Sequence, residues 1–441
     1  MGWASSENRY GDDKVFDACG LIGFIDTSGR RHSGDRVAAG LACMDERGNG
    51  LGAGYAAYGL YPEHADRYAL HAMCRSDAQR AALDAYLREH FAVVHDEPVP
   101  TRQVPGILDP PVLWRYFCTP LPERMVGRTE EDYVVHQVMT IHARLEGTYI
   151  VSSGKDMGIF KGVGHPEQIA EFYRVADYSA YLWTAHNRFP TNTPGWWGGA
   201  HPFGLLDWSV VHNGEISSYG INRRTVEMHG YRCDMRTDTE VFAYAADLLI
   251  RRHGLSPRLA AAVFAPPLWD AIDRMAPEEA AVYRALRQTY GSLLMNGPFT
   301  IILARNGEMM GLGDRVRLRP LVAAGVRTNA TLMFNPAQAL LAGLAGSPFI
   351  SPFIGRARMA GSDGIEAIRQ MRQLYDAWGI TQTVIIGASI KDVTQVIDVI
   401  LAGAHSVAVP FAVFAAMMEH PLTAQGVEHF AAEFDKVRSR G

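Results

Sequence analysis

Five short segments of this 441-residue chain carry reactive or polar side chains where predicted strands and helices begin or end. They are Cys19 and residues 186–193, 212–215, 236–240 and 311–321. A cysteine thiolate is a good nucleophile near neutral pH, and a guanidinium fork binds carboxylates. A side-chain amide and a backbone N–H can both donate to a developing negative charge. These are the residue types that hydrolysis of a carboxamide needs.

Each segment alone also has an ordinary structural interpretation. A lone cysteine before a strand is usually a buried small residue, and Asn-Gly is usually a turn. Arg188 would then form a surface ion pair, and Asp238 would cap the helix that follows it. His186 and His212 are expected to support their strands rather than to act in catalysis. The order and number of the segments therefore carry the functional hypothesis.

The predicted elements around these segments form an α+β pattern, with strands at both ends and helices between. A hairpin is expected around Asn306-Gly307, a strong two-residue turn signal. Two helical stretches are expected within residues 63–90, and residues 96–111, with five prolines, are expected to form an exposed loop. The strands nearest the polar segments are expected at residues 20–26, 148–152, 157–161, 182–187 and 208–213.

Together the five segments resemble the class II glutamine amidotransferases, which are N-terminal-nucleophile (Ntn) hydrolases. The resemblance is strongest to the amidotransferase part of glutamate synthases and covers about residues 17–322. It implies an αββα fold with two stacked sheets. It also implies a domain over residues 19–323 that releases ammonia from L-glutamine.

The resemblance assigns the nucleophile to Cys19, which would form a thioester with the substrate. In the family the mature chain begins at this cysteine, and its own α-amine is the base. An α-amine titrates at about 7.7 to 8.0, close to the operating pH. Residues 1–18 would then be a propeptide that must be removed.

The same resemblance assigns the other site residues. The side-chain amide of Asn213 and the N–H of Gly214 would form the oxyanion hole. Arg188 would bind the α-carboxylate of glutamine, and Asp238 would hold its α-ammonium group. Thr191 and Asn192 lie in the loop that would close over the site. No flavin- or ATP-binding motif is visible in this chain, so no cofactor is expected. The resemblance implies a separate FMN-containing glutamate-synthase-like subunit as the ammonia acceptor.

Beyond residue 324 the pattern changes to short apolar strands that are each followed by a helix. This βα repeat predicts a parallel sheet with right-handed crossovers. The strands are expected at residues 331–335, 349–353, 383–389 and 406–409.

Residues 325–441 resemble the transaldolases, in particular the fructose-6-phosphate aldolase branch. The motifs lie at residues 329–334, 338–341, 350–356, 387–389 and 420–423. The resemblance implies only strands five to eight of an eight-stranded barrel, hence a partial parallel half-barrel. The Schiff-base lysine of the family stands in a Lys-Ile-Pro context that this chain lacks. Arg356 and Ser389 match phosphate contacts of the family.

The composition of the chain argues against several classes of partner and location. The net charge of −5 and the pI of 6.3 argue against nucleic acid. The apolar run 399–418 is interrupted by Gly403, His405 and Pro410, so two helices around a short strand are expected, and no membrane segment. The five cysteines lack zinc-site spacing and are odd in number, which favours a reducing, cytoplasmic location and no metal.

Three functional hypotheses remain from the sequence. The leading one is a glutamine amidotransferase acting through Cys19. The alternatives are a sugar-phosphate aldolase or transaldolase-like lyase carried by residues 325–441, and a non-catalytic regulatory or chimeric scaffold. The open sheet edges of a half-barrel also predict that this segment docks on the strands of residues 19–323 or pairs with a second copy as a homo-oligomer.

Overall fold

The computed structural model describes residues 19–189, 195–319, 321–323 and 329–438. The chain divides into two compact units, Met1–Leu321 and Val322–Gly441. Among the described residues, no helix is both long and apolar enough to cross a bilayer. The interrupted run that begins at residue 399 forms the end of one helix, a short strand and a second helix, as the sequence predicts.

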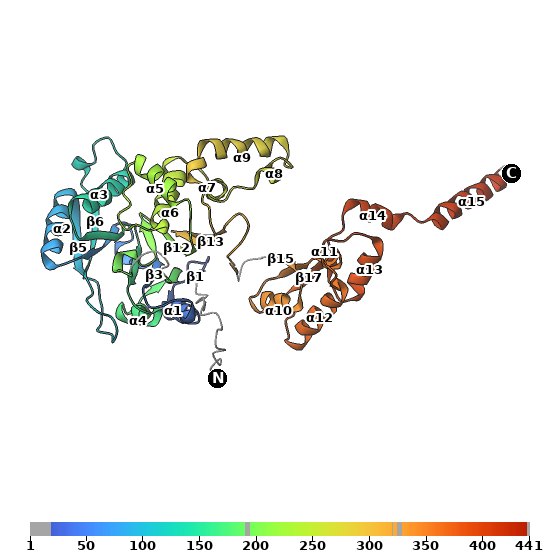
Figure 1. Ribbon diagram of the computed structural model, residues 1–441, viewed down its shortest axis with the longest axis horizontal. Helices are drawn as coiled ribbons and strands as arrows, with labels where there is room; N and C mark the ends of the chain where they lie inside the picture. Colours follow the sequence, from blue (N-terminus) through green and yellow to red (C-terminus); the bar gives the residue numbers. More distant parts are fainter. Residues whose placement is uncertain (1–18, 190–194, 320, 324–328, 439–441) are drawn as a thin grey trace, which may run out of the picture. The chain divides into compact units, whose positions relative to one another are not determined.

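Two four-stranded antiparallel sheets form the centre of the first unit (Figure 1). The strands of the first sheet are, in spatial order, β1 (Gly20–Ile25), β10 (Leu182–Asn187), β3 (Ala53–Tyr58) and β8 (Met157–Gly162). The strands of the second are β11 (Phe203–Leu205), β12 (Trp208–Gly214), β13 (Phe299–Arg305) and β14 (Glu308–Gly313). The polar segments 186–193 and 212–215 begin in β10 and β12, which are buried along nearly their whole length.

The two sheets stack face to face. Tyr58 of β3 reaches across and donates to Ser209 Oγ at 2.7 Å and to the Ala304 carbonyl at 3.0 Å, both in the second sheet. A side chain at Gly23 of β1 would lie 2.6 Å from Met309 Sδ of β14, so this close approach requires glycine. The tight packing fixes the ends of the strands relative to one another.

Helices cover the outer faces of this pair of sheets, which gives four layers. On the first sheet lie α1 (Asp35–Ala42) and α4 (Pro166–Phe172), and on the second lies α6 (Asp238–Ala246), against which α5 (Tyr219–Met228) packs. The remaining helices of this region are α7 (Pro257–Phe264), α8 (Trp269–Ile272) and α9 (Pro277–Thr289), and β2 (His32–Ser33) pairs with β9 (Ser179–Ala180). The predicted α+β class is confirmed, and the layering agrees with an Ntn-type domain.

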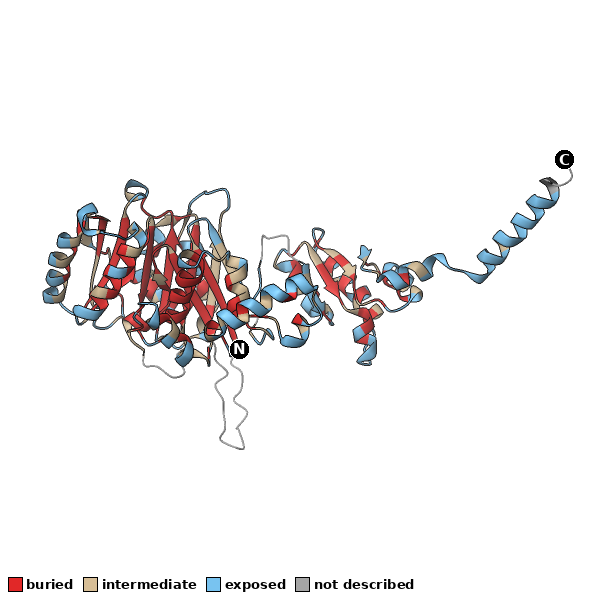
Figure 2. Cartoon of the chain, turned by 90° about the horizontal axis from the view of Figure 1, so that it is seen from above, coloured by how far each residue is buried: buried red, intermediate tan, exposed pale blue. Residues whose placement is uncertain are grey.

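A third antiparallel sheet was not predicted. It consists of β5 (Phe91–Pro98), β6 (Val112–Pro120), β4 (Tyr68–Cys74) and β7 (Thr148–Ser152), packed by α2 (Asp77–His90) and α3 (Glu130–Arg144). The prediction of two helical stretches within residues 63–90 is therefore wrong for β4. All seven residues of β4 are buried, so its sequence lacks the alternation of a half-exposed strand. Figure 2 shows the buried sheets of this unit between more exposed helices.

The second unit contains a parallel sheet whose strands follow one another in chain order. They are β15 (Asn329–Met333), β16 (Phe349–Pro352), β17 (Val384–Gly387) and β18 (Ser406–Val407). The helices are α10 (Pro336–Leu344), α11 (Ile354–Met359), α12 (Gly364–Ala377), α13 (Val393–Leu401), α14 (Phe411–Met418) and α15 (Pro421–Arg438). The predicted parallel βα repeat is thus present.

Side-chain caps mark the helix starts of this unit. Asn335 accepts from the Gln338 N–H at 2.9 Å, and Gln338 accepts in return from the Asn335 N–H at 3.3 Å, which is a capping box. Asp363 and Asp392 cap α12 and α13 through their side-chain oxygens alone, by accepting from backbone N–H groups of the first turn. Each helix therefore begins a few residues after the strand before it.

Candidate active site

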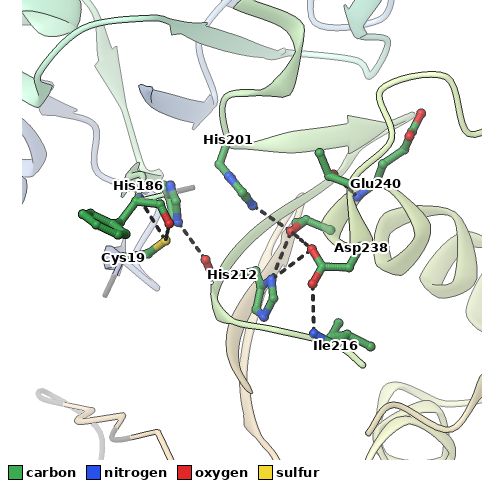
Figure 3. A network of polar contacts seen from close by, with 10 residues as sticks. Cys19, His186, His201, His212, Ile216, Asp238 and Glu240 are labelled. Atoms are coloured by element: carbon green, nitrogen blue, oxygen red, sulfur yellow. Dashed lines mark hydrogen bonds and ion pairs between the residues drawn. The ribbon is translucent and has the colours of Figure 1, made fainter. Parts of the chain in front are cut away.

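Cys19 lies at the mouth of β1, directly before Gly20, which pairs with Asn187 at the end of β10. The Phe189 N–H donates to Cys19 Sγ at 3.3 Å (Figure 3). Burial raises the pKa of the Cys19 thiol, while the Phe189 N–H and the Arg188 charge act in the opposite direction. The sulfur therefore lies at the edge of the sheet with one donor already in place, and it needs a base to become a thiolate.

Arg188 is the residue after β10, and only 4% of it is exposed. Its N–H donates to the Gly52 carbonyl at 2.8 Å, which continues the pairing of β10 with β3. A side chain at Gly52 would lie 3.2 Å from Arg188 Cδ, and one at Gly199 would lie 3.1 Å from Nη1. Burial lowers the pKa of Arg188, and the neighbouring Cys19 and Asp238 oppose this shift. The Arg188 side chain is thus held in a tight slot between Gly52 and Gly199.

Asn213 and Gly214 end β12, beside β10. The two strands are joined there because His186 Nε2 donates to the His212 carbonyl at 2.7 Å. Asn213 is 6% exposed, and its Oδ1 has no hydrogen-bond partner among the described residues. Gly214 has φ +128°, and a Cβ there would lie 1.9 Å from the Pro298 carbonyl oxygen. The sequence interpretation of Asn213-Gly214 as a simple turn does not hold, since both residues pair with β13.

Asp238 is the first residue of α6, and Thr237, not Asp238, is its N-cap. Thr237 accepts from the Glu240 N–H at 3.1 Å. The Asp238 carboxylate accepts from the Ile216 N–H at 2.9 Å, and its Oδ1 lies 3.5 Å from His212 Nδ1. Burial raises the pKa of Asp238, but His212 and the Ile216 N–H outweigh it, and the net pKa lies below its ordinary value. A stable carboxylate therefore faces the site.

Three buried imidazoles, His186, His201 and His212, connect these elements (Figure 3). His201 Nε2 lies 2.7 Å from Thr239 Oγ1, and His212 Nδ1 lies 3.1 Å from the same oxygen. The rings of His186 and His201 have centroids 4.0 Å apart. Burial lowers the pKa of His186 to about 3 and that of His201 well below its ordinary value. These two neutral rings hold β10, β12 and α6 together, and His201 was not anticipated from the sequence.

Comparison with known proteins identifies the family of this region of the chain. A family model described as "Glutamine amidotransferases class-II" matches residues 129–333, which include Arg188, Asn213, Gly214 and Asp238, while Cys19 lies before the match. An uncharacterized protein of Archaeoglobus fulgidus is 54% identical over 315 residues, which are 70% of this chain and 83% of that protein. This chain belongs to the class II glutamine amidotransferases.

The amidotransferase continues into a segment of a second family. A model described as "Transaldolase/Fructose-6-phosphate aldolase" matches residues 318–440. A probable transaldolase of Symbiobacterium thermophilum is 45% identical over 120 residues, and one of Bacillus cereus is 43% identical over 116 residues. These stretches are 27% and 26% of this chain but 55% and 54% of the two relatives. The chain therefore spans about half the length of the transaldolase relatives it matches.

A buried lysine of the amidotransferase domain was also missed. Lys161 on β8 is 0% exposed, and its ammonium donates to the Gly198 carbonyl at 3.0 Å and lies 4.0 Å from the centre of the Phe203 ring. Burial lowers the pKa of Lys161 to about 7. Gly198 precedes Gly199, which packs on the Arg188 guanidinium. The sequence feature that could have indicated this buried lysine is its position as the one charged residue in the apolar strand 157–162.

Several other predicted residues lie apart from this site. Thr191 and Asn192 fall outside the described residues. Cys74, Cys118 and Cys233 are buried, and Cys43 is exposed, so none of the four has the setting of Cys19. Within the described ranges no cluster of His, Cys, Asp or Glu could hold a metal ion.

Arg356 and Ser389 lie at one end of the parallel sheet of the second unit. The Gly355 N–H, next to Arg356, donates to the Ser389 carbonyl at 3.1 Å. Ser389 has φ +62°, and the exposed Arg356 guanidinium lies 5.2 Å from the centre of the Phe353 ring. The backbones of the two residues therefore lie near each other, past the carboxyl ends of β16 and β17.

Proposed function

We propose that this chain hydrolyses the side-chain amide of L-glutamine to glutamate and ammonia through a thioester on Cys19. The observation that carries the proposal is a chain of contacts that brings Cys19, Arg188 and Asp238 to neighbouring element ends. Cys19 Sγ accepts from the N–H of Phe189, the residue after Arg188, and the next links are His186 to the His212 carbonyl and His212 to Asp238. A nucleophile, a cation for the α-carboxylate and an anion for the α-ammonium group thus face one place. Glutamine carries these two charges on its α-carbon, two methylene groups away from its amide carbon.

The reaction follows from these positions. The Cys19 thiolate adds to the amide carbon, and the oxygen takes the negative charge beside the Asn213 amide and the Gly214 N–H. The C–N bond breaks as the nitrogen takes a proton from the base, which leaves ammonia and the thioester. Water then adds and gives its proton to the base. The C–S bond breaks, which returns the thiolate and releases glutamate. Thr191 and Asn192 would belong to the loop that covers the substrate.

The base in this proposal is the α-amine of Cys19, which exists only after residues 1–18 are removed. Burial raises the pKa of the thiol, so few thiolates form without a base. An amine that titrates at about 7.7 to 8.0 is partly neutral near the operating pH and can accept this proton. Intact-mass measurement of active protein tests this. A chain that retains Met1 or Gly2 at full activity would show that the α-amine of Cys19 is not required.

An electrophilic glutamine analogue, with a diazoketone in place of the amide, tests the nucleophile. It should add one label per chain on Cys19, and excess glutamine should protect against it. Cys43 is the internal control because it is exposed but has no neighbouring Arg188 or Asp238. Labelling of Cys43 in preference to Cys19 would contradict the assignment.

Ammonia released here needs an acceptor, and we propose a separate FMN-containing glutamate-synthase-like subunit. The support is the resemblance of residues 17–322 to the amidotransferase part of glutamate synthases. Affinity purification from the native cells should recover a flavin-containing synthase subunit in a fixed ratio. Recovery of the amidotransferase without any synthase would count against this acceptor. The proposed domain limits are 19–323 for the amidotransferase and 325–441 for the transaldolase-like segment.

A further inference from the structure

The second unit carries an unusual share of the exposed apolar surface. Eighteen of the thirty large apolar side chains that are exposed among the described residues lie in the 120 residues from Val322 onward. Soluble proteins rarely leave large contiguous apolar patches in water unless the patch binds something. Figure 2 shows much of the helical surface of this unit as exposed. The second unit therefore exposes apolar side chains that another structure would be expected to cover.

The parallel sheet shows where the core is incomplete. On one face, Ile350 of β16 and Ile385 of β17 are 0% exposed and pack in one cluster with Ile368 of α12 and Val399 of α13. Right-handed crossovers between strands in sequential order place all the helices on that face. The alternate residues Phe349, Val384 and Ile386 point to the opposite face and are only half-buried. Parallel sheets are normally covered on both faces.

Both edges of the sheet are also open. The outer strands are β15 and β18, and each pairs with a described strand on one side only. An unpaired strand edge presents N–H and C=O groups that readily bind another strand. The helices next to the two edge strands, α10 and α14, also expose apolar side chains. Leu341 and Leu344 of α10 are 68% and 54% exposed, and Phe411 and Phe414 of α14 are 82% and 50% exposed.

We propose that two copies of this chain join their second units into one closed eight-stranded barrel. The β15 edge of each copy pairs with the β18 edge of the other, and α10 of each copy packs against α14 of its partner. A twofold axis brings both edges together at once and covers both open faces, so no apolar edge remains. Eight strands give a barrel whose interior side chains just fill.

The size of the missing half of the barrel and the symmetry of a dimer favour a second copy of this chain as the partner of the second unit. The matched stretch makes up 54–55% of the transaldolase relatives, so the part they have in addition is about as large as this unit. A second copy therefore supplies the missing volume. The sheets of the amidotransferase unit are antiparallel, so they lack the parallel βα pattern that would continue this sheet. The pairing is independent of glutamine hydrolysis at Cys19.

Sedimentation of the full chain with the double substitution Leu341→Glu and Leu344→Glu tests the proposal. The unsubstituted chain should sediment at twice its 48.6 kDa mass, and the double variant at 48.6 kDa. Trp378→Lys is the control, since Trp378 is 61% exposed but follows α12, in the middle of the helix layer. It should leave the dimer intact. A monomeric unsubstituted chain, or a dimer that survives the double variant, overturns the proposal.

Hydrogen exchange locates the contact and guards against simple misfolding of the variant. Amides of residues 329–333 and 406–407 should exchange at least about tenfold more slowly in the dimer than in the double variant. Amides of β16, which is paired on both sides, should exchange alike in both if the unit stays folded. A monomer with protected edge amides would mean that they pair within the chain, and a dimer with unprotected edges would mean that it forms elsewhere. Either result contradicts the barrel.

Discussion

The Asp238 carboxylate accepts a hydrogen bond from the Ile216 N–H at 2.9 Å. This bond ties the first turn of α6 to the loop that follows Asn213 and Gly214. The proposed anchor for the α-ammonium group is therefore positioned relative to the proposed oxyanion hole by one direct contact. A substitution in the first turn of α6 should therefore alter the position of the loop after Gly214, and the reverse.

Asp238→Asn should raise the KM for glutamine more than it lowers kcat. The amide keeps an acceptor for the Ile216 N–H but has no charge for the substrate ammonium group. Charged hydrogen bonds contribute about 1.5–3 kcal/mol, so kcat/KM should fall by about 10- to 100-fold. Steady-state kinetics of glutamate release measures this, and Asp270→Asn on the exposed surface of α8 is the control. An unchanged KM would remove Asp238 from the substrate site.

Gly214→Ala should destabilise the amidotransferase domain as well as inactivate it. The new Cβ would lie 1.9 Å from the Pro298 carbonyl oxygen at a backbone φ of +128°. The combined clash and strain should cost about 3 kcal/mol of unfolding free energy. Gly230→Ala is the matched control, since φ there is +92° but nothing lies within 4 Å. It should cost about 1 kcal/mol, from strain alone. Equal losses in urea unfolding would mean that the approach to Pro298 does not matter.

The buried Lys161 should make the free energy of unfolding depend on pH. Its pKa is about 7 in the folded chain against an ordinary value of 10.5. Between these two values the unfolded chain keeps a proton that the folded chain has released, so the free energy of unfolding should rise with pH in this window. Lys161→Met should remove a rise of the order of a few kcal/mol between pH 7 and pH 10.

The control for this effect is Lys155→Met, because Lys155 is 38% exposed and pairs with Glu130 on the surface. Urea unfolding across the pH range should give the same slope for this control as for the unsubstituted chain. Glu240 has the opposite effect at lower pH. Burial raises its pKa from 4.5 to about 7, so between these two values the folded chain keeps a proton that the unfolded chain has released. The free energy of unfolding therefore falls as the pH rises through this lower window. A slope unchanged by Lys161→Met would show that the buried ammonium is not the cause.

Residues 325–441 should have no aldolase or transaldolase activity. Schiff-base chemistry needs a lysine that is neutral near pH 7, normally through burial. Lys391 follows β17 and is exposed, and Lys436 lies in α15. Incubation with fructose 6-phosphate should release neither glyceraldehyde 3-phosphate nor dihydroxyacetone. Borohydride should trap no carbonyl adduct. Turnover that is lost in Lys391→Ala would show that this segment is a working enzyme.

The sequence was informative where side-chain pattern and local geometry agree. Cys19 directly precedes β1, strands β10 and β12 end in polar segments as expected, and the parallel repeat from β15 to β18 follows its apolar runs. The third sheet was missed because β4 is buried along its whole length and so shows no strand alternation. Lys161 and His201 were missed because their roles depend on contacts with Gly198 and Thr239, which lie 37 and 38 residues away in the chain. No local pattern encodes such contacts.

Glutamate release from L-glutamine tests the central claim most directly. The purified, mature chain should release glutamate and ammonia in equal amounts, while Cys19→Ala should lose the activity by at least about 1000-fold, since the nucleophile carries the covalent step. Cys43→Ala, at an exposed cysteine away from Arg188, should retain full activity. Equal release by the unsubstituted chain and Cys19→Ala, or no release by either, would contradict the assignment of Cys19 as the nucleophile.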